Sequence, residues 1–315
     1  LGSLQPWSVF SEWETEVGTR KLHSFKDPSG DKRQHRLDGA AVKSLNAFAE
    51  LVSIIWLTPQ QDGLFRGPSE ERRAFFDQLV LALFPEHSRH LNAYAVSRRQ
   101  RSKLLREAAA FGKTPDPAWL ASIEDAMARH GVAIAEARMA ALSQLNVYVA
   151  QDFGPFPGAD IALQGDLEAA LQNSSAVDVE DWAKSTWAGN RQADQSAGKT
   201  HFGPHRSDLA VFHKAKGMPA QTCSTGEQKS LVIALVLAHI YAIAERRNLP
   251  AVLLLDEVAA HLDSRKRAAL FEALMELKAQ VWMTGTDPEA FEHLGQAAQA
   301  FNVSNSNLQP YELGA

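Results

Sequence analysis

The sequence has a single cysteine, no long apolar run and no surplus of basic residues. One cysteine, Cys223, in 315 residues excludes an internal disulfide framework and is typical of a protein from the reducing cytoplasm. No uninterrupted apolar stretch approaches the roughly 20 residues that a membrane-spanning helix needs, so we expect no membrane partner. The net charge of −5 argues against a protein that is basic throughout, yet it is compatible with a local basic surface for nucleic acid.

The residues that are present have the composition of a globular protein, 45% hydrophobic and 22% charged. Alternating apolar and polar residues near the start predict strands, residues 40–51 have helical spacing, and the apolar run Ser53–Leu57 predicts a buried strand. Helical spacing dominates from Ser69 to about Val149, and helices and strands then alternate as in a parallel α/β sheet. We therefore predict an α/β head in two parts, residues 1–66 and 166–315, with a helical arm, residues 67–165, inserted between them.

Two carboxylates follow an aliphatic run in the last third of the chain. Residues 252–255 predict a strand buried on both faces, and Asp256 and Glu257 stand at its C-terminal end, where open α/β sheets bind ligands. In a nucleotide-hydrolysing site Asp256 would hold Mg²⁺ and Glu257 would orient the attacking water. The pattern alone does not distinguish a nucleotide site from an ordinary strand end, since strands that emerge into solvent often end in acidic residues.

A hydroxyl- and glycine-containing loop lies upstream, directly before a long apolar helix. Ser224, Thr225 and Gly226 would present free backbone N–H groups and the positive end of a helix dipole, which together favour an anion. The same residues can instead form an ordinary helix cap, with Glu227 completing a capping box. A second hydroxyl-containing loop, residues 284–287, would emerge beside Asp256 if its strand is a neighbour, or would simply cap the helix that starts at Pro288.

In this order the segments resemble the second half of an ABC-type ATPase head. The resemblance implies a signature loop at residues 224–228, a Walker B strand ending in Asp256 and Glu257, and a D-loop at residues 260–263. In such heads the signature loop contacts ATP bound by the other subunit, so two heads would close on two ATP molecules. The residues that this resemblance assigns to nucleotide are Ser224, Thr225, Gly226, Gln228 and Asp263, with Thr286 at the switch position.

Three longer segments narrow the resemblance to the RecF family. They are residues 67–77 (GPSEERRAFFD), 203–209 (GPHRSDL) and 253–263 (LLLDEVAAHLD), the last followed by Arg265, Lys266 and Leu270. The resemblance covers essentially the whole chain and implies an ABC/SMC-type head with a P-loop NTPase-like sheet and an inserted helical arm. It also implies ATP and Mg²⁺ as cofactors, an ATP-dependent homodimer, and work near the nucleoid on gapped DNA and single-strand junctions. The implied partners are RecO and RecR, which load RecA.

The sequence departs from that family's pattern in two places. Where the family has Pro-Glu-Asp, this chain has Pro59-Gln60-Gln61-Asp62, so either glutamine could be the Q-loop sensor of Mg²⁺; we assign Gln60. Residues 193–200, ending in Gly198-Lys199-Thr200, fit a relaxed phosphate-loop pattern, but no aliphatic strand precedes them and His201-Phe202-Gly203-Pro204 cannot open a helix. We therefore expect a strand–loop–helix unit to precede Leu1 in the native protein, and no ATP hydrolysis by this chain alone.

A cluster of basic residues falls on the predicted arm. Such a cluster could neutralise DNA phosphates, or it could be an ordinary solvated helix face. The candidates for DNA contact are Arg98, Arg99, Arg101 and Lys103 on the arm and Arg72 and Arg73 at its base, where internal pairing is the alternative. Two other functions stay open: a non-catalytic DNA-binding scaffold fragment, and another SMC-like ATPase, which would add an acidic nuclease domain that nothing after Asp287 supplies.

Overall fold

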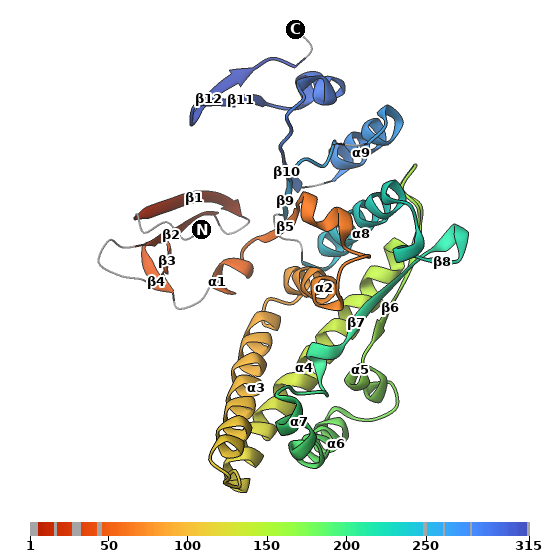
Figure 1. The fold of residues 1–315 in the computed structure, drawn as a ribbon. Coiled ribbons are helices and arrows are strands. Elements are labelled where there is room, and N and C mark those ends of the chain that lie inside the picture. The colour runs from red at the N-terminus through yellow and green to blue at the C-terminus, as the bar shows by residue number, and fades with distance from the viewer. Residues whose placement is uncertain are drawn as a thin grey trace.

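We describe a computed structural model of the chain, over residues 6–15, 18–26, 33–42, 46–247, 251–260, 262–277 and 279–313. Figure 1 shows an elongated molecule with the helical arm at one end, an antiparallel sheet from the N-terminal residues at one side, and a C-terminal hairpin at the other end. A small parallel sheet lies where these parts meet. This order agrees with the predicted head that is interrupted by an arm.

The N-terminal sheet is an antiparallel meander of β1 (Trp7–Thr15), β2 (Gly18–Lys26), β3 (Arg33–Leu37) and β4 (Ala40–Val42). The helix predicted over residues 40–51 is therefore wrong in its first part, and only α1 (Asn46–Ala49) is helical. The reason is the turn at Asp38 and Gly39, which both have positive φ and pair Ala40 with Leu37. An Asp-Gly pair is a hairpin signal, and it prevails over the weak helical spacing that follows it.

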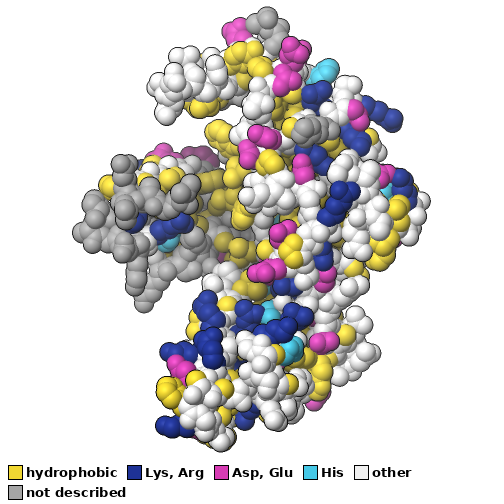
Figure 2. Space-filling model, viewed as in Figure 1, with side chains coloured by type: hydrophobic (Ala, Val, Ile, Leu, Met, Phe, Trp, Pro, Cys, Tyr) yellow, Lys and Arg dark blue, Asp and Glu magenta, His cyan; other side chains and the backbone are white. Residues whose placement is uncertain are grey.

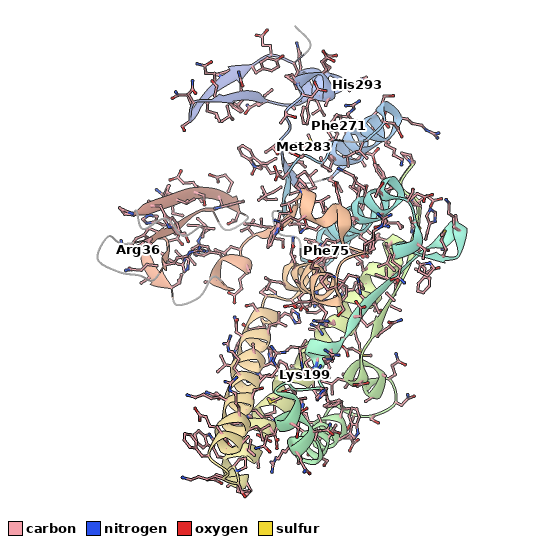
Figure 3. The ribbon with its side chains drawn as sticks, in the orientation of Figure 1. Arg36, Phe75, Lys199, Phe271, Met283 and His293 are labelled. Atoms are coloured by element: carbon pink, nitrogen blue, oxygen red, sulfur yellow. The ribbon has the colours of Figure 1, made fainter. Side chains whose placement is uncertain are left out.

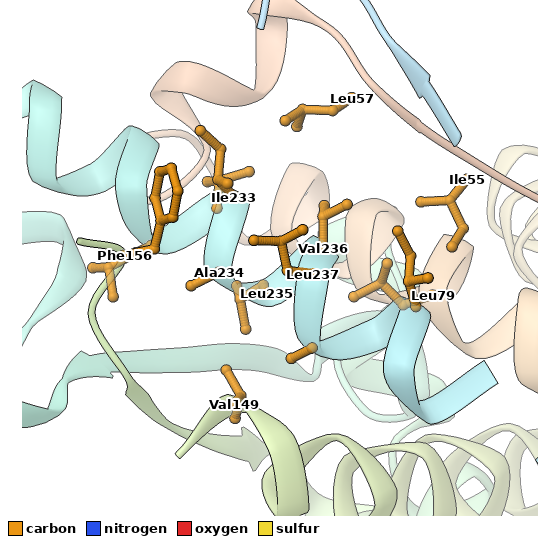
Figure 4. Packing of buried hydrophobic residues seen from close by; sticks show 14 of the residues in the cluster. Ile55, Leu57, Leu79, Val149, Phe156, Ile233, Ala234, Leu235, Val236 and Leu237 are labelled. Atoms are coloured by element: carbon orange, nitrogen blue, oxygen red, sulfur yellow. The ribbon is translucent and has the colours of Figure 1, made fainter. Parts of the chain in front are cut away.

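The parallel sheet has the order β10–β9–β5 and consists of β5 (Ser53–Leu57), β9 (Ala251–Leu255) and β10 (Ala279–Met283). Helix α8 (Thr225–Arg247) packs on one of its faces, where Ile233, Val236 and Leu237 gather with Ile55 and Leu57 of β5 (Figure 4). By length and composition α8 could cross a bilayer, but 83% of its most apolar window is buried in the fold, as in a core helix. Helix α9 (Ser264–Glu276) connects β9 to β10.

The opposite face of the parallel sheet is partly bare. Trp56, Leu254 and Trp282 stand in one row across the three strands, because Leu254 pairs in register with both tryptophans. Their exposed fractions are 41%, 39% and 55%. Val252, lower on the same strand, is instead buried against Leu22 of the N-terminal sheet. Figure 2 shows the apolar side chains in the notch beside that sheet.

The arm is built on three long helices: α2 (Ser69–Leu83), α3 (His87–Ala110) and α4 (Pro117–Val149). Its separate apolar core includes Met127 of α4 and also Leu167, Trp187 and Phe202, so the arm extends past the predicted boundary at residue 165. The shorter helices that join it are α5 (Asp166–Leu171), α6 (Ala176–Gly189) and α7 (Arg191–Ala197). The sequence-based boundary came too early because these short helices belong to the arm only through their tertiary packing.

The remaining elements link or extend these parts. An antiparallel sheet of β6 (Ala159–Gln164), β7 (Asp208–His213) and β8 (Met218–Pro219) runs from the arm to the head. The short 3₁₀ helices are η1 (Pro59–Gly63), η2 (Pro204–Arg206), η3 (Lys214–Lys216), η4 (Ala220–Thr222) and η5 (Pro288–Ala297). The C-terminal hairpin is formed by β11 (Ala300–Ser304) and β12 (Asn307–Tyr311).

Candidate nucleotide site and basic surface

Asp256 and Glu257 stand at the carboxyl end of the central strand of the parallel sheet, and we call them the acidic strand end. The Asp256 N–H donates to the Leu57 carbonyl at 2.8 Å, which continues the pairing of β9 with β5 past the last strand residue. Both side chains are exposed to solvent. The predicted strand is therefore correct in its position and in the direction in which it emerges. It is not buried on both faces as predicted, because Leu254 is 39% exposed.

Thr284, rather than Thr286, contacts the acidic strand end. The Thr284 hydroxyl donates to Asp256 Oδ1 at 2.5 Å and accepts the Glu257 N–H at 3.2 Å. Because β10 is the parallel neighbour of β9, the first residue after β10 arrives level with Asp256. Thr286 lies two residues farther along and is exposed, so we correct the residue beside Asp256 to Thr284.

Glu257 has a backbone φ of +51°, in the left-handed region that non-glycine residues rarely adopt. The conformation follows the abrupt end of β9, after which Val258 and Ala259 turn back into the core. Left-handed backbone at a residue with a long side chain is often associated with function. Here it leaves the Glu257 carboxylate in solvent beside Asp256.

The strand end suits Mg²⁺ only if other oxygens complete the coordination. Among the described residues, no group of three or more His, Cys, Asp or Glu side chains could hold a metal ion by itself. Magnesium commonly binds one or two carboxylates together with waters and substrate phosphates. Asp256, with one oxygen engaged by Thr284, fits that kind of shared site, in which the nucleotide supplies the remaining ligands.

The predicted anion loop, residues 224–226, opens α8 and faces solvent. A Cβ built on Gly226 would meet nothing within 4 Å, so the space next to the backbone is open. The N-terminus of a 23-residue helix lies directly behind this space, where backbone N–H groups and the helix dipole favour an anion. A second molecule could reach this loop, as the predicted role requires.

Glu227 forms one half of the capping box that we noted as the alternative function of this loop. Its Oε2 accepts from the Ser224 N–H at 2.9 Å and from the Ser224 hydroxyl at 2.8 Å. The ion pair with Lys216, followed by these two hydrogen bonds, lowers the pKa of Glu227 to about 2. The Ser224 hydroxyl is therefore engaged by a carboxylate here, and it would have to rotate to donate to a phosphate.

Gln228 does not face the nucleotide space. It is fully buried, and its amide Nε2 donates to the Cys223 carbonyl at 2.8 Å. The assignment of Gln228 to nucleotide binding is therefore corrected: it holds the shape of the loop from behind. Side chains of a helix tilt toward its N-terminus, so Gln228 in the first turn of α8 can reach the backbone of the preceding loop. A residue of the predicted motif can therefore support the loop without contacting nucleotide.

Lys229 connects three of the candidate segments, and its role was missed from the sequence. Its ammonium group, almost completely buried, donates to the Ala260 carbonyl at 2.8 Å and to Asp62 at 3.2 Å. The first turn of α8 thus meets both the segment that follows the acidic strand end and η1. A lysine beside the predicted signature loop gave no signal, because its partners are 167 and 31 residues away in sequence.

The two glutamines of the Pro59–Gly63 segment have different surroundings. The Gln61 side chain accepts from the Thr58 N–H and hydroxyl, both at 2.7 Å, so it caps η1. Gln60 is exposed, which favours it as the Q-loop residue. In the predicted D-loop, Asp263 caps α9 by accepting the Lys266 N–H at 2.8 Å, and His261 lies outside the described residues.

The Gly-Lys-Thr sequence at 198–200 has the surroundings of a helix end. Helix α7 precedes it, and Gly198 closes that helix in a left-handed conformation with φ +66°. A phosphate loop needs a strand before it and a helix after it, whereas η2 and β7 follow here. The surroundings agree with the prediction that this segment is no phosphate loop.

We expect calorimetric titration of this chain with MgATP to give no saturable heat, because no backbone cradle for the β- and γ-phosphates is present in the described residues. Lys199→Ala should leave that result unchanged. Saturable binding at micromolar ATP that disappears in Lys199→Ala would show that residues 193–200 do bind phosphate.

Three of the arginines predicted to contact DNA are engaged inside the protein. Arg101 has no exposed surface and donates to Glu124 at 2.9 Å, Asp194 at 2.6 Å and the Trp187 carbonyl at 2.8 Å. Because burial and three partners occupy its guanidinium, the predicted DNA contact of Arg101 is wrong. Arg72 forms a two-pronged pair with Asp208, and Arg73 donates to the Ser207 carbonyl, as our alternative anticipated.

The remaining arm residues lie on an accessible basic surface. Burial lowers the pKa of His205 to about 4, against a hydrogen bond with the Thr200 carbonyl that raises it. The charges of Arg98 and Arg206 lower this pKa further, so both arginines lie near the histidine. Figure 2 shows Lys and Arg side chains gathered on the part of the arm nearest the head, and Figure 3 labels Lys199 on the arm. We define the basic arm surface as Arg98, Arg99, Lys103, Lys199 and Arg206.

No family model matches the chain, but individual proteins do. The DNA replication and repair protein RecF of Mesorhizobium japonicum is 45% identical over 301 residues, 95% of this chain and 77% of the relative. That of Allorhizobium ampelinum is 42% identical over 98% of this chain and 82% of the relative. A solved structure described as the recombination mediator protein RecF with ATPrS in the RecFOR pathway superposes with a TM-score of 0.83 at 18% identity, over 97% of this chain and 80% of that one.

Proposed function

The chain belongs to the RecF family of DNA replication and repair proteins, and on that premise we propose that it is a recombination mediator that binds DNA, and that binds ATP when a phosphate loop completes its site. The observation that carries the proposal is the pairing of two solvent-facing features on neighbouring segments: the acidic strand end and the loop at residues 224–226. Lys229 joins the bases of both. A solved RecF is described with ATP, which supports a nucleotide at this site.

In the proposed mechanism each head holds one nucleotide at its own strand end and covers the nucleotide of a twin molecule with its loop. Asp256 would share Mg²⁺ with the phosphates, Glu257 would orient the attacking water, and Thr284 would keep Asp256 in position. Ser224, Thr225 and Gly226 would donate to the partner's nucleotide. Gln60 is proposed as the Q-loop sensor of Mg²⁺, Asp263 as a nucleotide contact from the D-loop, and Thr286 as a more distant contact.

The phosphate loop itself is proposed to sit on the bare face of the parallel sheet. A helix with an apolar side would bury Trp56, Leu254 and Trp282 and would end close to Asp256. Burial of three such side chains is worth several kcal/mol at about 25 cal/mol per Å². A strand–loop–helix unit is the simplest segment that supplies both that apolar helix and a glycine-rich loop at its start.

The finer biological role is also a proposal. We infer action on gapped DNA and single-strand junctions in the cytoplasm, near the nucleoid, in concert with RecO and RecR, which would load RecA. A solved RecF structure described within the RecFOR pathway supports the first two partners. The alternative, a DNA-binding scaffold without hydrolysis, is favoured by the helix-end surroundings of Gly198-Lys199-Thr200.

The basic arm surface gives the direct test of DNA binding. We expect the double variant Arg98→Glu and Arg99→Glu to weaken binding to gapped DNA at least tenfold, because two phosphate contacts become repulsive. The salt dependence should also flatten by about one unit for each lost contact. Fluorescence anisotropy over a range of salt concentrations measures both quantities.

A matched control reverses two cations elsewhere on the arm, Arg129→Glu and Lys184→Glu, which both lie beside Asp125. The control should keep the affinity and the salt slope. Equal losses in the two double variants would mean that overall charge, and not this surface, governs binding.

A further inference from the structure

The outward face of the N-terminal sheet carries a row of rings and one guanidinium. Phe10 of β1 lies opposite His23 of β2, with ring centroids 6.1 Å apart, and His23 stacks on Phe25 at 4.6 Å. The Arg36 guanidinium of β3 also lies over the Phe25 ring, 5.2 Å from its centroid. We call Phe10, His23, Phe25 and Arg36 the aromatic row. It crosses three neighbouring strands on a single face.

Packing inside the protein does not account for this row. Strand residues alternate between faces, and the other face carries Leu22, Trp13 and Leu37, which pack toward the parallel sheet. Phe10 is 56% exposed. Within the described residues, the extensive contacts of β1 and β2 are with each other and with β3. The aromatic row therefore faces away from the core of the head.

The row is built to keep its rings fixed. The Ser8 hydroxyl is 2.8 Å from His23 Nε2, and Phe25 contacts both the His23 ring and the Arg36 guanidinium. Phe10 stands at the end of the row, with its ring tilted 68° to that of His23 and with 56% of its surface exposed. The exposed Phe10 ring thus lies beside two side chains, His23 and Phe25, whose positions are fixed by their own contacts.

The charge of this sheet is opposite to that of the whole chain. Its described residues, 6–15, 18–26 and 33–42, include five Lys or Arg and three Asp or Glu, a balance of +2, in a chain of net charge −5. Three of these cations, Arg20, Lys26 and Arg33, lie on the opposite face. The face of the aromatic row carries Lys21 and Arg36 together with two glutamates, Glu12 and Glu14, and Lys21 is ion-paired with Glu12 at 3.1 Å. Exposed rings with a guanidinium beside them on an antiparallel sheet are a combination that binds unpaired nucleotides, by stacking of bases and by attraction of phosphates.

We propose that the aromatic row binds single-stranded DNA, with a base stacked on Phe10 and the backbone beside Arg36. The proposal deepens the proposed function, and rests on it for its biological setting: the duplex would lie on the basic arm surface and the unpaired strand of a gap on this sheet. Base stacking is indifferent to sequence, since every base has a π face. The site would thus distinguish unpaired from paired DNA without reading a sequence.

The test compares an oligothymidylate with a duplex of equal length by fluorescence anisotropy. Phe10→Ala should weaken oligothymidylate binding at least about fivefold, the lower end of what one stacked base contributes. Phe10→Trp should retain the affinity, because it keeps a ring. Phe301→Ala, which removes another exposed strand phenylalanine, should change nothing. Duplex binding should be the same in all four proteins.

Ultraviolet crosslinking with an iodouracil-substituted oligonucleotide adds a readout that a merely structural residue would not move. The crosslinked peptide should contain Phe10 or His23. Unchanged affinity in Phe10→Ala, a crosslink confined to the arm, or no oligothymidylate binding by the wild-type protein would each overturn the proposal. If the wild-type protein binds oligothymidylate through Phe10 but no duplex, the inference stands while the role of the basic arm surface fails.

Discussion

Arg101→Ala is expected to lower the free energy of unfolding by about 3–5 kcal/mol, the usual cost of removing one partner from a buried ion pair. The substitution leaves Glu124 and Asp194 with less compensation in a site where both carboxylates are almost fully buried. It also frees the Trp187 carbonyl, which Arg101 holds at 2.8 Å. Urea unfolding followed by circular dichroism measures the loss.

Two further variants separate burial from charge. Arg99→Ala, its exposed neighbour, should stay within about 0.5 kcal/mol of the wild type, as surface substitutions usually do. Arg101→Lys should recover only part of the loss, because an ammonium cannot reproduce three donations in the fixed geometry of a guanidinium. An Arg101→Ala protein as stable as the Arg99→Ala protein would contradict the buried position of this side chain.

The second large effect is expected at Glu257, in a version of the protein that carries a phosphate loop. Glu257→Gln should lower ATP turnover by about 10²- to 10⁴-fold, the contribution typical of a positioned general base. Nucleotide affinity should remain, since the exposed side chain can change without disturbing the core. An ATP-bound dimer should then accumulate, and size-exclusion chromatography with light scattering would detect it.

Glu272→Gln supplies the matched control, because this exposed glutamate of α9 undergoes the same chemical change away from the strand end. It should hydrolyse ATP at the wild-type rate. Wild-type turnover in Glu257→Gln would remove Glu257 from the mechanism, and a loss of ATP binding would assign it to nucleotide affinity instead of to the chemical step.

Much of the fold could be predicted because its signals are local. Ser53–Leu57 and the aliphatic run before Asp256 read as buried strands from their own residues, and both form the parallel sheet. The long helices of the arm were found for the same reason, since helical spacing repeats over many turns. The turn at Asp38 and Gly39 is also a local signal, and starting a helix directly after it, at residue 40, was a wrong choice between two patterns.

The errors in the site concern side-chain burial, which depends on distant segments. Arg101 belongs to a basic run that resembles a solvated helix face, yet its partners come from α4, α6 and α7. Gln228 stands in a motif for nucleotide but turns inward. Thr284 was missed in favour of Thr286 because strand register decides which hydroxyl comes level with Asp256.

The left-handed backbone at Glu257 has a consequence for how this position tolerates change. Left-handed conformation costs an L-residue about 1–2 kcal/mol that glycine does not incur. The chain therefore holds a carboxylate where its own backbone favours glycine or asparagine. At this position ATP hydrolysis and thermal stability therefore favour different residues. A selection for more stable variants would tend to replace the glutamate on which hydrolysis is proposed to depend.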